Sequence, residues 1–133
     1  MLNGFNIICE SLQSHDVSYI IHKHLPRMGS PHYDLRFGNP YNSKELFSFA
    51  APSNFLETIN QKTLLVRTKN HLERWMDLKS YRLTDIEKNK VTIKVLTLKY
   101  FELIFHGKLL KGNYKLFKLQ KTYRDDRWLL IKK

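Results

Sequence analysis

The fold is decided by SYIIHKHLPRMGSPHYDLRF, residues 18–37, in which two runs of alternating side chains flank a loop with two prolines and a glycine. Alternation with a period of two indicates β-strands, because successive side chains of a strand point to opposite faces. The prolines and the glycine favour a turn between the runs. Before the loop, the side chains that share one face are Ile20, His22 and His24. After it, the polar side chains that share one face are His32, Asp34 and Arg36.

The rest of the chain is also divided into short alternating segments. The expected strands are ELFSFAAP (45–52), TLLVRTK (63–69), KVTIKVLTLKY (90–100), FELIFHGKLL (101–110), YKLFKLQKTY (114–123) and RWLLIKK (127–133). The expected turns are EKNK (87–90) and KGN (111–113), and the expected helical or irregular segments are SNFLETINQK (53–62) and HLERWMDLKSYRL (71–83). This pattern predicts an all-β, mainly antiparallel fold, either a sandwich or a small closed or partly open β-barrel, with one or two short helices.

The length of 133 residues and a hydrophobic content of 42% predict one globular domain over residues 1–133, in which residues 1–17 form an N-terminal arm. Cys9 is the only cysteine, so no intrachain disulfide is expected. The chain shows no leader pattern and no window near the roughly 18 apolar residues of a membrane span. We therefore expect a cytoplasmic monomer with no membrane partner.

The net charge of +11 comes from 23 basic and 12 acidic residues. Such an excess favours polyanionic partners, of which nucleic acid is the commonest soluble one and an anionic membrane surface the next. The composition therefore predicts nucleic-acid binding.

The two polar faces form a candidate metal site if their strands pair across the loop. Two neutral imidazoles and one carboxylate suit manganese, iron, cobalt or zinc, and they leave positions open for water or a substrate oxygen. Arg36 lies on the same face as Asp34, and its fork of donors suits a phosphate. Alternatively, this is a surface strand in which Asp34 and Arg36 form a solvent-screened salt bridge. His22 is either a ligand in place of His24 or a hydrogen-bonded neighbour.

Roughly residues 18–133 resemble the 3′-phosphoesterase domain of bacterial ligase D and its free-standing bacterial and archaeal relatives. The segments that carry the resemblance, in order, are YIIHKH, HYDLRF, SFAAP, LLVRTKNHLERW, FELIFHGKLLKGNYKLFKL and RWLLIKK. The histidine before the loop, the HYDLR run and the C-terminal GKLLKG and WLLIKK segments are its most specific parts.

This resemblance implies a compact β-barrel enzyme of DNA repair that uses Mn²⁺, or another divalent ion such as Co²⁺ or Zn²⁺, to process DNA 3′ ends. It implies a primer–template or a single strand as substrate, and a DNA ligase or polymerase as a partner. By position, His24, His32 and Asp34 resemble the metal ligands. Arg36 and His71 resemble the pair that binds the scissile phosphate, which makes these five residues the catalytic set.

Four departures from the family pattern bear on the substrate. The loop between His24 and His32 is two residues longer than in the family. Ser53 stands where the family has a lysine, Thr63 where it has an arginine, and Trp75 where it has a tyrosine. Because phosphate-binding groups are missing, we expect removal of a 3′-phosphate rather than of a 3′-ribonucleoside.

Two other functions fit the same sequence. One is a catalytically inactive basic β-barrel that binds DNA or RNA ends or docks on a repair partner. The other is a basic barrel that binds RNA or a ribosomal surface, with the histidines incidental. Trp75 and Trp128 either stack on bases or belong to the hydrophobic core.

Overall fold

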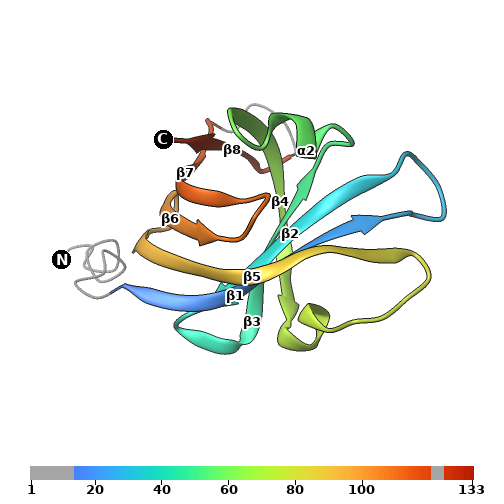
Figure 1. The fold of residues 1–133 in the computed structure, drawn as a ribbon, viewed down its shortest axis with the longest axis horizontal. Coiled ribbons are helices and arrows are strands. Elements are labelled where there is room, and N and C mark those ends of the chain that lie inside the picture. Colours follow the sequence, from blue (N-terminus) through green and yellow to red (C-terminus); the bar gives the residue numbers. More distant parts are fainter. Residues whose placement is uncertain (1–13, 121–124) are drawn as a thin grey trace.

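The computed structural model describes residues 14–120 and 125–133, which form a closed antiparallel β-barrel (Figure 1). Around the barrel the strands follow the order β1, β2, β3, β4, β8, β7, β6, β5. Their bounds are β1 His15–His24, β2 His32–Asn39, β3 Asn42–Ala51, β4 Lys62–Leu72, β5 Leu83–Leu96, β6 Tyr100–His106, β7 Lys111–Lys118 and β8 Arg127–Lys132. The predicted all-β fold is confirmed, and of the two predicted architectures the barrel is correct.

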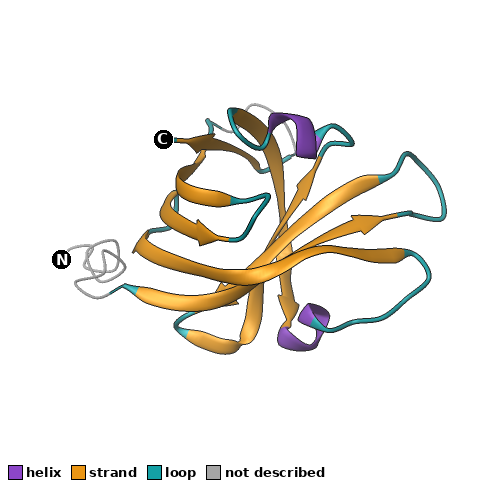
Figure 2. Ribbon diagram, in the orientation of Figure 1, coloured by secondary structure: helices purple, strands orange, loops and turns teal. Residues whose placement is uncertain are grey.

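Two short helical segments accompany the strands of the described chain, α2 at Phe55–Thr58 and the 3-10 helix η1 at Glu73–Met76 (Figure 2). They lie at opposite ends of the barrel. Within the described ranges, no helix combines the length and the apolar character needed to cross a membrane. Most of the predicted N-terminal arm, residues 1–13 with Cys9, lies outside the described residues, as does the end of the predicted strand 114–123.

Several predicted bounds are wrong. EKNK (87–90) lies inside β5 and is not a turn. Glu87 points into the barrel and Lys88 points outward, so the charged side chains of this run alternate as they do in a strand. The turn after β6 comprises residues 107–110 rather than KGN, and β5 already ends at Leu96. The possible helix over residues 71–83 is reduced to η1, because β4 continues to pair as far as Leu72.

The barrel interior holds one hydrophobic cluster that is rich in aromatic rings. Phe37, Phe49, Phe101 and Trp128 pack there with ring-centroid separations of 5.5 to 6.3 Å. Removing each such side chain from water stabilises the fold by about 1.5–3 kcal/mol. Trp128 is fully buried among them, so the prediction that it belongs to the core is confirmed and base stacking by Trp128 is excluded.

A second, smaller hydrophobic cluster lies on the outer side of the barrel wall. It consists of Ile20 of β1, Leu46 of β3 and Met76 of η1, with Trp75 packed against them. Ile20 and its neighbour Ile21 are both fully buried, although successive residues of a strand face opposite sides. β1 is therefore covered on both faces, and η1 supplies the outer cover next to the predicted polar site.

Candidate functional site

The register of β1 and β2 brings the predicted site residues onto one patch of the outer wall. His24 pairs with His32 and His22 pairs with Asp34. Residues opposite each other in antiparallel strands have side chains on the same face. The predicted pairing across the proline loop is thus confirmed, and the loop, residues 25–31, lies outside the paired strands whatever its length.

His24, His32 and Asp34 form the candidate metal centre. Nδ1 of His24 lies 3.3 Å from Oδ2 of Asp34, and Nε2 of His32 lies 3.3 Å from Oδ1 of the same carboxylate. The candidate ligand atoms all lie within 4.8 Å of one another. Both histidine side chains are about 30% exposed, whereas the residue Asp34 is 6% exposed. The cluster is therefore closed on the side of the Asp34 carboxylate and open to solvent on the side of the two imidazoles.

The donor set and a buried oxygen of Asp34 fit a divalent ion. Oδ2 of Asp34 is buried and has no hydrogen-bond partner in the part of the chain that the structure describes. Its charged or polar neighbours are Nδ1 of His24 and Nη2 of Arg36, each 3.3 Å away, and a bound cation would add a direct ligand bond to this buried oxygen. Nitrogen and oxygen donors in this combination suit manganese, cobalt or zinc.

Arg36 lies next to this cluster and is 3% exposed. Its Nη1 donates a hydrogen bond to Nδ1 of His22 at 2.7 Å, and its Nη2 forms an ion pair with Oδ2 of Asp34 at 3.3 Å. The guanidinium lies over the ring of Trp75, 4.8 Å from its centroid. Burial lowers the pKa of Arg36 while Asp34 raises it. A pair this buried does not fit the alternative of a solvent-screened surface salt bridge.

His71 reaches the same patch from β4. Its Nδ1 shares a hydrogen bond of 2.8 Å with the hydroxyl of Ser48, and its ring meets Trp75 edge to face at 4.7 Å. Burial lowers the pKa of His71, and the positive charge of Arg36 lowers it further, against a smaller opposing effect of Asp34. The imidazole is therefore neutral at pH 7 and can accept a proton.

Trp75 separates the two predicted phosphate-binding side chains and contacts both. Because it also packs against the cluster of Ile20, Leu46 and Met76, it belongs to the outer hydrophobic cluster as well as to the wall of the site. Thr63, at the position of a family arginine, is buried near the start of β4, where its hydroxyl bonds to that of Thr58. It does not replace the missing arginine.

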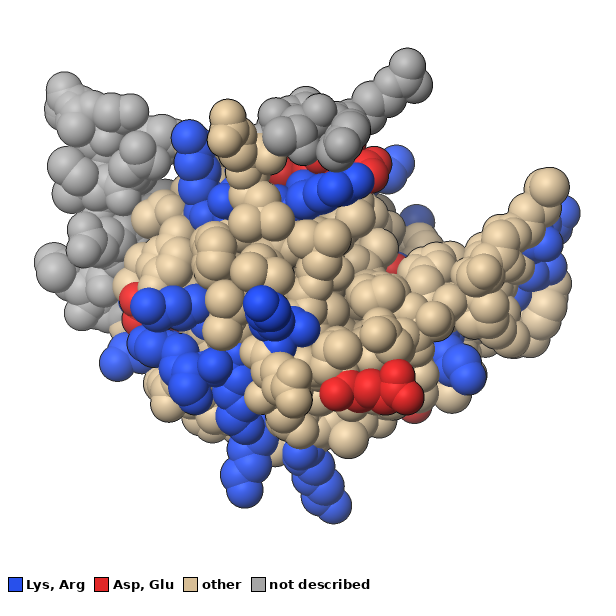
Figure 3. Space-filling view, turned by 90° about the horizontal axis from the view of Figure 1, so that it is seen from above, with Lys and Arg blue, Asp and Glu red and all other residues tan. Residues whose placement is uncertain are grey.

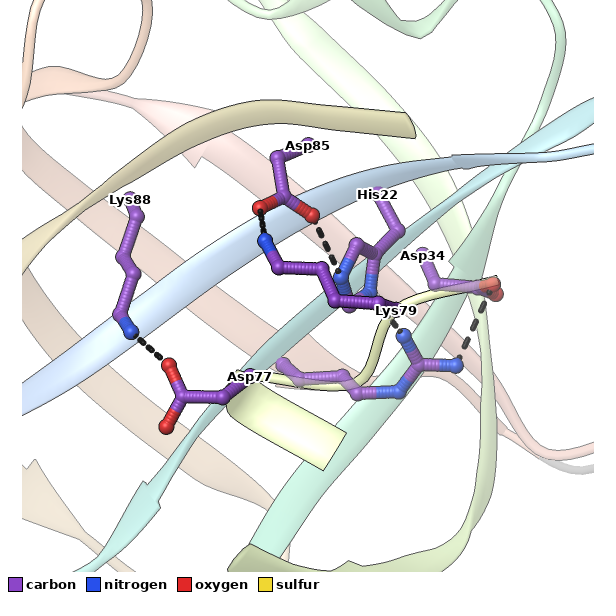
Figure 4. Close-up of polar contacts among 7 residues, drawn as sticks. His22, Asp34, Asp77, Lys79, Asp85 and Lys88 are labelled. Carbon is purple, nitrogen blue, oxygen red and sulfur yellow. Dashed lines mark hydrogen bonds and ion pairs between the residues drawn. The ribbon is translucent and has the colours of Figure 1, made fainter. Parts of the chain in front are cut away.

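Sequence analysis missed Asp85, which the structure places beside His22. Nε2 of His22 lies 3.2 Å from Oδ1 of Asp85, whose other oxygen accepts a hydrogen bond from Lys79 at 2.9 Å (Figure 4). Next to them, Lys88 of β5 pairs with Asp77. Asp85 could have been predicted only by recognising that its strand, β5, pairs with β1. The turn wrongly predicted at residues 87–90 interrupted that strand.

No protein-family model matches this chain, and no curated protein sequence matches it. The resemblance to the 3′-phosphoesterase domain therefore stays a prediction that rests on the residues quoted above.

Proposed function

We propose that this protein is a metal-dependent phosphoesterase that removes phosphate from the 3′ ends of nucleic acid. The observation that carries this proposal is the convergence of two imidazoles and a buried carboxylate with a buried arginine. Metal ligands next to a fork of donors are what a phosphate monoester needs, because its charge is spread over several oxygens. In a cell such ends would pass to a DNA ligase or polymerase.

In this proposal His24, His32 and Asp34 hold the ion, with Mn²⁺ as the first candidate and Co²⁺ or Zn²⁺ as alternatives. Such an ion, when bound, supplies Lewis-acid stabilisation of the charge on phosphoryl oxygens. Arg36 binds a further phosphate oxygen through its guanidinium. In the proposed hydrolysis, water forms the new P–O bond and the bond from phosphorus to the 3′ oxygen breaks. Neutral His71 would accept the proton that the water releases, and the 3′ oxygen would leave as a hydroxyl after taking up a proton.

The nucleic-acid part of the proposal is supported by exposed lysines on two strands of the barrel wall. On the outer faces of β5 and β7, the exposed lysines are Lys88, Lys90, Lys94, Lys111 and Lys115. In Figure 3, Lys and Arg side chains gather on one side of the face shown, with few acidic side chains among them. A polyanion bound there releases counterions, so its affinity falls steeply with salt.

A primer assay tests the function. A 3′-phosphate primer and a 3′-ribonucleotide primer are incubated side by side with Mn²⁺, Co²⁺, Zn²⁺ or a chelator. We expect the 3′-hydroxyl product from the phosphate primer only with metal, and loss of that product in His32→Ala and Asp34→Ala. His106→Ala and Asp125→Ala are matched controls, because these residues lie outside the site. Full activity in both site variants would contradict the proposal.

One observation favours a second function, a barrel that binds nucleic-acid ends without turnover. Arg36 already pairs with Oδ2 of Asp34, the same oxygen that faces His24, so Arg36 offsets part of the carboxylate's charge. Salt-dependent binding of both primers with no product under any of the three metals would favour this alternative.

A further inference from the structure

His22 is fully buried, and the roles proposed above do not use it. Each of its ring nitrogens faces a charged group. Nδ1 lies 2.7 Å from Nη1 of Arg36, and Nε2 lies 3.2 Å from Oδ1 of Asp85. Asp85 in turn is held by Lys79, which lies in the segment between η1 and β5. A continuous chain of contacts thus runs from Lys79 to the phosphate-binding arginine.

The partners of His22 define where its proton lies. A guanidinium has donors and no acceptor, so Nδ1 of His22 must accept the hydrogen bond from Arg36 and carries no proton. The proton of the ring is then on Nε2. That atom is buried with no hydrogen-bond partner of good geometry among the described residues, and Asp85 lies within reach of it. Oδ1 of Asp85, 3.2 Å away, is the acceptor that this proton faces.

We propose that His22 and Asp85 are positioning residues that orient Arg36 for phosphate binding. Asp85 keeps the proton of His22 on Nε2, which leaves Nδ1 as the acceptor that fixes the guanidinium of Arg36. This inference rests on the proposed function, because Arg36 is its phosphate-binding group.

The other contacts of Arg36 do not fix its orientation. The face of Trp75 permits rotation of the guanidinium in its own plane, and the ion pair with Asp34 is longer, at 3.3 Å. Nε of Arg36 is buried without a hydrogen-bond partner in the described chain. Without the bond to His22, Arg36 can turn further onto Asp34 and away from the phosphate.

Two substitutions of His22 separate orientation from packing. His22→Leu fills the space but removes the acceptor, whereas His22→Asn retains an oxygen near the place of Nδ1. We expect kcat/KM for a 3′-phosphate primer with Mn²⁺ to fall about 10- to 100-fold in His22→Leu, as for other residues that orient a site. In His22→Asn it falls only a few-fold. An equal, large loss in both variants would overturn the proposal.

A double-mutant cycle tests whether His22 acts through Arg36. In the Arg36→Ala background, His22→Leu changes kcat/KM by less than about twofold, since there is no guanidinium left to orient. The same fold-loss in both backgrounds would show that His22 serves the fold alone and would overturn the proposal.

Asp85 offers a milder test, since its side chain is 40% exposed. We expect Asp85→Ala to lower kcat/KM several-fold and Asp85→Asn, which keeps an acceptor, to lower it less. The matched control is Asp77→Ala, which also removes a carboxylate from a lysine but does not contact His22. An equal loss in Asp77→Ala would assign the effect to net charge and overturn the role of Asp85.

Two measurements do not need turnover. The ¹⁵N spectrum of the histidine rings should show His22 neutral with its proton on Nε2, and His22→Leu should weaken binding of a 3′-phosphorylated oligonucleotide to the purified protein. A proton on Nδ1, or unchanged binding, overturns the positioning of Arg36. If both expectations hold and no 3′ end is processed, the proposed function fails while the positioning stands.

Discussion

His24 and His32 face each other across β1 and β2 with ring centroids 4.8 Å apart, although the whole proline loop separates them in the chain. Their separation is set by strand register and not by the loop. A loop longer than in the resembling family therefore leaves the two candidate ligands together, and its extra residues change only the rim of the site.

Removal of one imidazole ligand should lower the affinity of the protein for metal ions. We expect His32→Ala to weaken Mn²⁺ and Co²⁺ binding at least tenfold, since even residues that only orient metal ligands cost about 10- to 100-fold. Isothermal titration of the purified protein measures this. His106→Ala is the control, because His106 bonds to Thr92 on another part of the barrel. Equal affinities in the two variants would contradict the assigned metal centre.

Substitution of Arg36 by lysine keeps the charge but removes the fork of donors. A lysine cannot donate to His22 and bind a phosphate oxygen in one fixed plane, so we expect kcat/KM for a 3′-phosphate primer to fall at least about tenfold. Mn²⁺ affinity should change much less, because Arg36 is not a ligand. The primer assay and metal titration together check this. A variant that lost metal binding and activity in parallel would show that Arg36 supports the metal centre instead.

Glu87 should make stability depend on pH in acid. Its carboxylate accepts hydrogen bonds from Tyr19 and from the backbone amides of Lys108, Leu109 and Leu110. Burial raises the pKa of Glu87, but these hydrogen bonds together outweigh it, so the pKa lies below its ordinary value of 4.5. The ionised form thus stabilises the fold above pH 4.5, and this contribution is lost as the pH falls through the lowered pKa.

Glu87→Gln measures that contribution. We expect it to lower the free energy of unfolding by about 1.5–3 kcal/mol at pH 7, the range for hydrogen bonds to charged groups. The difference from the natural protein should shrink below pH 4.5. Urea unfolding at several pH values checks both statements. A difference that grew in acid would mean that the sign of the pKa shift is wrong.

Gly107 is required by the same contact. A Cβ atom added there would overlap the Tyr19 hydroxyl and the Glu87 carboxylate. We expect Gly107→Ala to destabilise the protein by about 1–3 kcal/mol, as for other insertions into packed regions. Tyr19→Phe removes one of the two obstacles, so the double variant should lose less than the sum of the single losses. Additive losses in thermal unfolding would contradict this reading of Gly107.

The sequence was sufficient for the all-β fold and for the patch formed by β1 and β2, because both follow from a period of two, but it left a sandwich and a barrel as alternatives. Once Ile20, His22 and His24 share a face, the pairing across the loop leaves little freedom for Asp34. Strand bounds in the lysine-rich half were harder to predict. In that half, a strand whose charged side chains alternate between the interior and the exterior of the barrel has the same amino-acid composition as a turn.

The environment of the patch could not be predicted from local pattern. Burial of Arg36 depends on η1, which covers the outer wall through Met76 and Trp75, far along the chain. The neighbour Ser48 comes from β3, which pairs with β2, and Asp85 comes from β5, which pairs with β1 although it lies far along the chain. Their contributions require the closed barrel, which no single segment specifies.

Ile21 and His22 are adjacent in the chain, one facing the barrel interior and the other the site, and neither is exposed. A larger interior side chain on this strand would press the backbone outward and shift the arginine that His22 holds. Attempts to make the protein more heat-resistant should therefore begin with the interior side chains of β6 and β7, which take no part in the proposed site. In β1, by contrast, a substitution that changes thermal stability would also change the proposed phosphate-binding site.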